Sequence, residues 1–248
     1  MKLRLDQALM ERGLCESREK AGRAILAGEV RINGQTAGKA SALVSPQDRL
    51  ELEAPEKFVS RGGYKLERAL DYFGIDVKGT TALDVGASTG GFTDCLLQRG
   101  AIKVYAIDVG RGQLAWKLRH DPRVVVMEKT NARELTLASF PGSWTPATLA
   151  VMDCSFISLR KIIPPVVALL PPSARIVALI KPQFEAGKAE ADRGAGVIRD
   201  PAIHERVLRE LQDFVSAQSG LLWRGAVESP ITGPAGNKEF LALIEKTG

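Results

Sequence analysis

The chain has 248 residues, of which 45% are hydrophobic and 25% are charged. This composition is typical of a folded protein and excludes an intrinsically disordered chain, while the length suits one medium-sized domain beside a smaller one. Lys and Arg number 34 against 29 Asp and Glu. The resulting net charge of +5 permits an anionic partner without establishing one.

Cysteine and histidine usage narrows the class of protein further. Three cysteines lie far apart in the sequence, and there are only two histidines. We therefore expect no disulfide framework, no bound metal and a cytoplasmic location. The longest apolar stretch, 162–172, contains four prolines and is shorter than the roughly 20 residues that a membrane helix needs. We expect no membrane span, which disfavours a pore-forming protein.

The N-terminal part of the chain carries short, closely spaced signals. Apolar residues at helical spacing over 5–9 predict a first helix, and Ser17 is suited to cap a second helix. Residues 30–32 alternate as a strand that leads into Asn33-Gly34, the residue pair preferred in tight hairpin turns. These signals predict a small α+β domain.

We place this first domain at 1–56, a linker at 57–63 and a second domain at 64–248. The second domain opens with helical spacing over 64–73, after which apolar runs alternate with helical stretches. The strand-like runs cover residues 82–85, 104–107, 124–127, 149–152, 176–180, 221–224 and 240–244. Apolar strands separated by helices predict a parallel sheet covered on both faces, the doubly wound, Rossmann-like α/β architecture.

The sharpest local signal is ALDVGASTGGF at 82–92, a buried strand followed by glycines and a helix that starts near Phe92. One interpretation is a dinucleotide site, but its third motif position is Ser88 rather than glycine. A second interpretation is a serine hydrolase with Ser88 as nucleophile, because Asp153 and His204 follow in the required order. In such hydrolases several strands precede the nucleophile, whereas this loop follows the first strand of its domain.

A third interpretation is a site for S-adenosylmethionine (SAM), and we favour it. Asp84 ends the strand before the glycines, and Asp108 ends the next strand, where a carboxylate can hold both ribose hydroxyls. Asn131 follows the third strand and is placed either to meet the adenine or merely to form a turn. The predicted cofactor-binding residues are Asp84, Gly86, Ala87, Ser88, Thr89, Gly90, Gly91, Phe92, Asp108, Val109, Asn131, Ala132 and Asp153.

Motifs along almost the whole chain resemble a known family. The N-terminal RLDQALMERGLCESREKAGRAILAGEVRINGQ is similar to S4-like RNA-binding domains, and the remainder resembles FtsJ-like (RrmJ-type) ribose methyltransferases. Together with VSRGGYKLERAL, DVGASTGGFTD, MDCSFISL, IKPQFEAG and GPAGNKEF, the combination resembles the TlyA family, also called hemolysin-like rRNA methyltransferases. The resemblance implies SAM-dependent methylation of cytidine 2′-hydroxyls in ribosomal RNA.

The resemblance also implies a catalytic tetrad, carried by the motifs onto Lys65, Asp153, Lys181 and Glu239. The residues themselves support two of these, because Asp153 and Lys181 each follow an apolar strand, at the edge where parallel sheets build their sites. Apolar surroundings and the neighbouring Lys65 favour Lys181 as the base, with the two carboxylates orienting the lysines. By spacing alone, Lys65 and Glu239 are ordinary solvent-exposed positions.

Basic residues supply candidates for phosphate contacts, although charge runs are usually solvated surfaces. The predicted RNA-binding residues are Arg4, Arg18, Lys20, Arg23, Arg31, Arg61, Lys188 and Arg193. Residues 184–199 are either a flap that faces the substrate or a surface insertion. The basic stretch 99–123 is either a second RNA-binding surface or an ordinary solvated surface. Aromatic residues make up only 6%, which suits structured RNA better than a single strand.

The expected partner is ribosomal RNA or a ribosomal subunit, and a monomer is favoured. Members of the resembled family differ at the N-terminus. Because the first helix starts close to the first residue here, we expect the form without an N-terminal extension, and large-subunit (23S) RNA as its substrate, with 16S RNA possible. The main alternative is a non-catalytic RNA-binding factor of the ribosome, which keeps the basic module without the tetrad. The serine hydrolase and a membrane-lytic hemolysin are remote alternatives.

Overall fold

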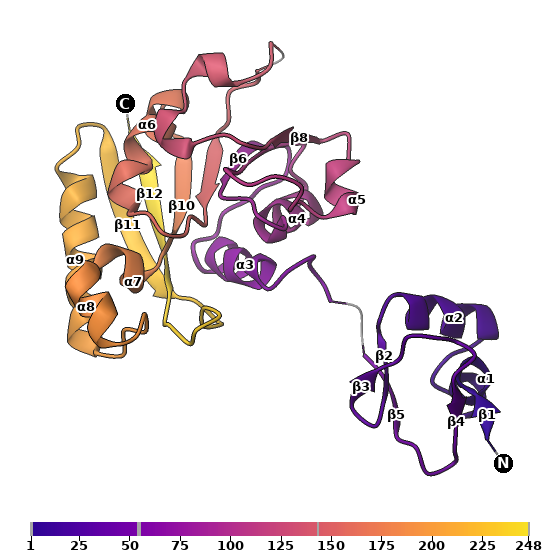
Figure 1. Cartoon of the computed structure of the whole chain (residues 1–248). Coiled ribbons are helices and arrows are strands. Elements are labelled where there is room, and N and C mark those ends of the chain that lie inside the picture. The colour runs from indigo at the N-terminus through magenta and orange to yellow at the C-terminus, as the bar shows by residue number, and fades with distance from the viewer. Residues whose placement is uncertain (1, 54–55, 143, 248) are drawn as a thin grey trace. The chain divides into compact units, whose positions relative to one another are not determined.

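The computed structural model describes residues 2–53, 56–142 and 144–247, apart from the side chains at 188, 191 and 193. It divides into two compact units, Met1–Lys57 and Phe58–Gly248, labelled along the chain in Figure 1. Residues 58–63, which we expected in the linker, belong to the second unit. The Phe58 ring is buried there and packs edge-on against Tyr64, with ring centroids 5.1 Å apart. Residues 54–55, beside the predicted domain boundary, lie outside the described residues.

The first unit is a small α+β fold, as predicted. Its helices are α1 (Leu5–Glu11) and α2 (Arg18–Leu26), and its strands are β1 (Leu3–Arg4), β2 (Val30–Ile32), β3 (Gln35–Thr36), β4 (Leu43–Val44) and β5 (Leu50–Leu52). The Ser17 side chain accepts a hydrogen bond from the Lys20 N–H, which confirms the predicted cap. Asn33 and Gly34 both have positive φ (51° and 82°), as the tight turn between β2 and β3 requires.

Asp6, at the start of α1, joins the two helices of this unit. Its carboxylate accepts hydrogen bonds from Arg4 (3.1 and 3.2 Å) and from Arg18 (3.0 Å). Hydrogen bonds from Arg4 and, secondarily, Arg18 lower the pKa of Asp6 to about 2, although its burial acts in the opposite direction. The ionised carboxylate therefore stabilises the folded unit at neutral pH.

We expect acid to weaken this unit through Asp6. Because folding lowers this pKa from its ordinary 3.8, the stabilisation is complete above that value and is lost as pH falls toward about 2. The exposed arginines limit it to about 1–2 kcal/mol. Amide hydrogen exchange of α1, measured between pH 4 and pH 2, should show this loss in the wild type and its absence in Asp6→Asn. Equal pH dependence in both proteins would contradict the assignment to Asp6.

The second unit is built on a seven-stranded sheet in the order β11-β12-β10-β9-β6-β7-β8. The strands are β6 (Thr81–Val85), β7 (Lys103–Ile107), β8 (Val124–Met127), β9 (Leu149–Met152), β10 (Arg175–Ile180), β11 (Leu221–Glu228) and β12 (Phe240–Lys246). All seven predicted runs are strands. However, β12 pairs antiparallel with both of its neighbours, β11 and β10. The connection from β11 contains no crossover helix, which accounts for the antiparallel direction of these two consecutive strands.

Helices cover both faces of this sheet. They are α3 (Gly62–Tyr72), α4 (Gly91–Gln98), α5 (Trp116–Arg119), α6 (Ile163–Leu169), α7 (Pro182–Glu185), α8 (Lys188–Arg193) and α9 (Pro201–Ser216), with short 3-10 turns at η1 (Ala132–Glu134), η2 (Leu137–Ser139) and η3 (Leu159–Lys161). Successive β6 residues belong to different core clusters, Ala82 with α3, α4 and α5, and Leu83 with α6 and α9. The sheet is therefore buried on both faces, which explains why its strands read as continuous apolar runs.

Within the described part of the chain, no helix is long and apolar enough to cross a bilayer. The same residues contain no group of three or more His, Cys, Asp or Glu side chains placed to hold a metal ion.

Candidate active site

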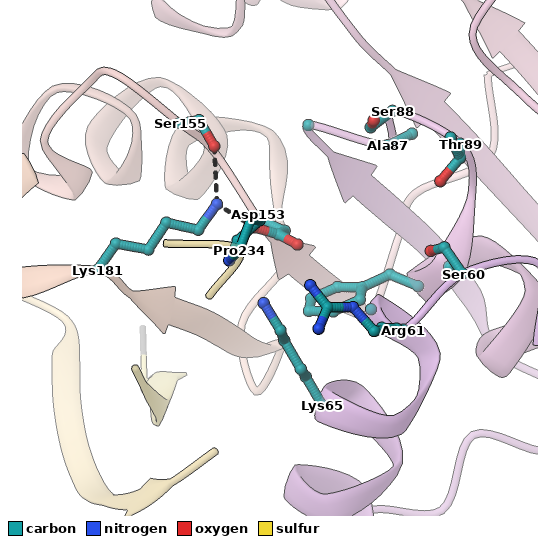
Figure 2. A pocket seen from close by; sticks show the side chains of 14 residues that line it. Ser60, Arg61, Lys65, Ala87, Ser88, Thr89, Asp153, Ser155, Lys181 and Pro234 are labelled. Carbon is teal, nitrogen blue, oxygen red and sulfur yellow. Dashed lines mark hydrogen bonds and ion pairs between the residues drawn. The ribbon is translucent and has the colours of Figure 1, made fainter. Parts of the chain in front are cut away.

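Two adjoining cavities open at the carboxyl ends of the parallel strands. The first has a volume of about 240 Å³ and is lined from α3, the glycine loop, β9 and β10 (Figure 2). The second, of about 420 Å³, runs along the ends of β6 and β7. Gly86, Ser88, Asp153 and Ser155 line both cavities. The site lies where strand order reverses on either side of β6, the place where open α/β sheets bind their ligands.

The glycine loop between β6 and α4 forms the wall that the two cavities share. Gly86 has φ +85°, and a Cβ there would lie 2.6 Å from the carbonyl oxygen of Asp153. Gly90 also has positive φ, and the loop places Ser88 at φ +48°. The loop can therefore lie this close to the backbone of Asp153 only while residue 86 has no side chain.

Replacing Gly86 by alanine should abolish or greatly weaken cofactor binding, because its new methyl group would collide with backbone rather than with a movable side chain. Gly79→Ala is the matched control, since Gly79 also has positive φ (+74°) but has nothing within 4 Å of the added Cβ. Equilibrium dialysis with labelled SAM measures both. If both changes weakened SAM binding equally, backbone strain alone would explain the effect. The close approach of Gly86 to the Asp153 backbone would then have no role in cofactor binding.

Asp108, at the end of β7, is held by the backbone around the second cavity. Its Oδ2 accepts the Ser88 N–H at 2.7 Å, and its Oδ1 accepts the Gly110 N–H at 2.7 Å. Each carboxylate oxygen has a second lone pair, so the group can still accept from two ligand hydroxyls. Asn131 lines the same cavity, but its Oδ1 accepts the Arg133 N–H and its Nδ2 donates to Glu134. Its side chain thus acts as the cap of η1.

Asp84 is fully buried behind the glycine loop. Its Oδ2 accepts a hydrogen bond from Thr93 Oγ1 at 2.6 Å, whereas Oδ1 has no hydrogen-bond partner among the described residues. Burial raises the pKa of Asp84 to about 7, opposed by the Thr93 hydrogen bond and reinforced by the charge of Asp153. Neither Asp84 nor Gly90 lines either cavity in the described structure, so both lie behind the predicted cofactor surface.

The predicted tetrad forms two lysine–carboxylate pairs. Lys65 Nζ, from α3, donates to Glu239 Oε2 at 2.5 Å, and both side chains are almost fully buried (9% and 1% exposed). Lys181 Nζ lies 2.5 Å from Asp153 Oδ1 as an ion pair and donates a hydrogen bond to Ser155 Oγ at 2.8 Å. Figure 2 shows the Lys65 and Lys181 side chains reaching into the first cavity from two different elements, Lys65 from α3 below and Lys181 from the end of β10 at the left. Buried charges are tolerated because each is paired.

A half-buried glutamate joins the two loops that follow β9 and β10. Glu185, at the end of α7, accepts hydrogen bonds from Ser158 Oγ (2.6 Å) and from the Leu159 N–H (2.7 Å). Burial raises the pKa of Glu185, opposed by the Ser158 and Leu159 hydrogen bonds. The loop that carries Asp153 is thereby joined to the segment that begins at Lys181.

Several cavity residues were not predicted. Ser155 follows Asp153 within the same motif, and Ser60 precedes α3, so their places beside predicted residues are the signals that point to them. Nothing in the sequence distinguished Phe156. In the structure it has a positive φ (+64°), is 90% exposed and lines the second cavity. The remaining unpredicted lining residues are Gly62, Ile107, Gly110, Gln113, Thr130, Cys154, Ile157, Ile162 and Pro234. Conversely, predicted Ala87, Thr89, Gly91, Phe92, Val109 and Ala132 do line the cavities.

The predicted RNA-binding residues of the first unit are engaged in ion pairs. Lys20 pairs with Glu16, Arg23 with Glu19 and Arg31 with Glu53, in addition to Arg4 and Arg18 at Asp6. Exposed pairs of this kind are worth only about 0–1 kcal/mol, so phosphates can compete for the cations. In the second unit, Arg61 lines the first cavity. The side chains of Lys188 and Arg193 lie outside the described residues.

The serine hydrolase interpretation finds no support in the geometry. Ser88 Oγ contacts Gln113 Oε1 at 3.3 Å, while His204 Nε2 lies 3.0 Å from the Ile198 carbonyl oxygen. Asp153 pairs with Lys181 instead of a histidine. These three side chains therefore do not form a nucleophile–base–acid relay.

Comparison with known proteins agrees with this site. The model of FtsJ-like methyltransferases matches residues 58–246, and the S4 domain model matches residues 3–50. The 16S/23S rRNA (cytidine-2′-O)-methyltransferase TlyA of Mycobacterium tuberculosis (strain ATCC 25618 / H37Rv) is 46% identical over 249 residues, covering 97% of this chain and 89% of that relative. The 23S rRNA (cytidine-2′-O)-methyltransferase TlyA of Campylobacter jejuni is 35% identical over 196 residues, covering 78% and 73%.

A solved structure of a hemolysin-type protein from Streptococcus thermophilus superposes with a TM-score of 0.74 at 44% identity, covering 99% of this chain and 89% of that one. Relatives thus match across both units, in the order that the motifs predict. With an S4 domain followed by an FtsJ-like domain that carries the glycine loop and both lysine–carboxylate pairs, the chain belongs to the TlyA family of FtsJ-like methyltransferases.

Proposed function

We propose that this methyltransferase transfers the methyl group of SAM to the ribose 2′-hydroxyl of a cytidine in ribosomal RNA, with the 23S RNA of the large subunit as its main substrate. The observation that carries the proposal is the presence of two lysine–carboxylate pairs, one of them almost fully buried, at a cavity that adjoins the cofactor cavity. A poor nucleophile such as a ribose hydroxyl needs both orientation and removal of its proton. The names of both enzyme relatives include 23S RNA and cytidine.

The residues at the second cavity fit SAM. Asp108 keeps one free lone pair on each carboxylate oxygen for the two ribose hydroxyls. Gly86 lets the glycine loop lie directly against the backbone of Asp153 at the edge of both cavities. SAM carries positive charge, and when bound it supplies an electrophilic methyl group. Uncharged walls such as Ile157 and Ile162 are suited to the adenine ring.

The first cavity is where the reacting ribose is placed. Lys181 is held by Asp153 and Ser155, which fixes the position of its Nζ against the incoming hydroxyl. In its neutral form Lys181 Nζ accepts the hydroxyl proton, and Asp153 stabilises the ammonium that results. Lys65, held by Glu239, donates a hydrogen bond to the ribose or to its neighbouring phosphate. This contact keeps the 2′-hydroxyl aligned with the methyl group that it receives. Arg61 lines the same cavity and provides a further cation for RNA phosphate.

Transfer to separated ribosomal subunits tests the proposal. Purified protein is incubated with SAM labelled in its methyl group and, in separate reactions, with small and large subunits that lack the modification. We expect label in large-subunit RNA, at a linkage that resists alkaline hydrolysis because its 2′-oxygen is blocked. Label in small-subunit RNA alone would overturn the subunit assignment. RNA binding without transfer to either subunit would replace the proposal by the non-catalytic factor.

A further inference from the structure

The segment that follows β7 has an inner face that supports the cofactor site. Val109 and Gln113 line the second cavity. Leu114 and Leu118 are buried beneath the glycine loop, where their methyl carbons would lie 2.8 and 2.3 Å from a Cβ at Gly90. The segment is therefore fixed in place by its packing, beside α4 and β8 (Figure 1).

The outer face of the same segment presents an aromatic pair to solvent. Trp116, the first residue of α5, is 74% exposed. Its ring lies on that of His120, with centroids 4.3 Å apart and planes inclined by 31°, and His120 Nδ1 is 2.8 Å from the Trp116 carbonyl oxygen. The imidazole thus packs against the indole, and its own position is fixed by the contact with the Trp116 carbonyl oxygen. An exposed indole is a ready contact for a flat partner.

Positive charge accompanies this pair. Arg111 is exposed in the same segment, and Lys117 keeps 56% of its side chain exposed while its Nζ lies 3.0 Å from Asp94. An aromatic face next to cations is the combination with which proteins hold unpaired bases and their phosphates. A protein partner would more readily use an uncharged surface at the core of its interface.

We propose that Trp116 and His120 form a stacking contact for an unpaired base of the substrate RNA, with Arg111 and Lys117 meeting its phosphates. This inference rests on the proposed rRNA methyltransferase function and adds an RNA contact outside both cavities. Because the inner face of the segment packs on the glycine loop, a strand bound here is held beside the reaction site.

Binding measurements on the full-length protein test the stacking contact. The probes are purified large and small ribosomal subunits for RNA affinity and SAM alone for cofactor affinity. We expect Trp116→Ala to weaken subunit binding by about 5- to 50-fold with SAM affinity unchanged, and Trp116→Phe to recover most of the loss. Tyr72→Ala is the matched control, since Tyr72 is an exposed aromatic (56%) on α3 of the same unit, and it should leave RNA affinity unchanged.

Salt dependence separates stacking from charge. Each phosphate contact that is lost should lower the slope of log affinity against log salt concentration by about 0.7–0.9. We therefore expect Arg111→Gln to reduce this slope, whereas Trp116→Ala should lower affinity at every salt concentration with the slope unchanged.

Two results would overturn the proposal. One is wild-type RNA affinity in Trp116→Ala, and the other is an equal loss of SAM and RNA affinity, which would make Trp116 a support of the cofactor loop. Failure of the proposed function looks different: the wild type would transfer no methyl group to ribosomal RNA, whereas its RNA affinity would still depend on Trp116.

Discussion

Lys181→Ala should lower the rate of methyl transfer by about 10²- to 10⁴-fold while SAM binding stays close to that of the wild type. This is the usual contribution of a positioned acid or base. Lys181 Nζ is held between Asp153 and Ser155 in the first cavity, so alanine removes both the proton acceptor and the group that orients the hydroxyl. Single-turnover transfer to ribosomal subunits measures the chemical step without product release.

Lys161→Ala is the control for this change, because Lys161 is an exposed lysine on η3 of the same unit. It should retain the wild-type rate. If Lys181→Ala kept more than about a tenth of the wild-type single-turnover rate, Lys181 would not be the base, and positioning by the other tetrad residues would have to account for the acceleration.

Glu239→Ala should destabilise the second unit by about 3–5 kcal/mol, because it leaves the Lys65 ammonium buried without its partner. Urea unfolding followed by tryptophan fluorescence measures this, since Trp116, Trp144 and Trp223 all lie in the second unit. The double variant Lys65→Met/Glu239→Leu should recover most of the lost stability, because no unpaired charge remains.

Glu228→Ala is the matched control for Glu239→Ala. Glu228, at the end of β11, pairs with Lys238, the neighbour of Glu239 in the connection to β12, but both side chains are more than half exposed (55% and 54%). Such a pair contributes about 0–1 kcal/mol. Equal destabilisation by the two glutamate changes would contradict the idea that burial makes the Lys65–Glu239 pair different.

The inner strands of the sheet were predictable because they are buried on both faces and read as apolar runs, whereas the edge strand β11 is partly exposed along its length. The glycine loop was predictable for a related reason, since Gly86 and Gly90 occupy positive-φ positions that follow directly from a strand end. The cap at Ser17 and the turn at Asn33-Gly34 depend on local hydrogen bonds and dihedral angles, which neighbouring residues determine.

Pairing across the fold was not predictable from local pattern. Lys65 and Glu239 are 174 residues apart, and spacing alone made both look like exposed positions. The antiparallel direction of β12 and the contact of Ser155 with Lys181 likewise arise from tertiary packing. Asn131 is different, because the sequence left two roles for it, a contact with adenine or a turn. Its hydrogen bonds to Arg133 and Glu134 are those of a turn-forming residue.

Nucleoside analysis of the methylated RNA tests the central claim most directly. Large-subunit RNA labelled by the wild-type protein is digested to nucleosides, and the labelled nucleoside is identified by chromatography and mass spectrometry. The two lysine–carboxylate pairs beside the cofactor cavity predict a nucleoside methylated on its 2′-oxygen, and the proposed substrate makes that nucleoside 2′-O-methylcytidine. A label on a base, with an unmodified ribose, would contradict the assignment of the first cavity to the 2′-hydroxyl.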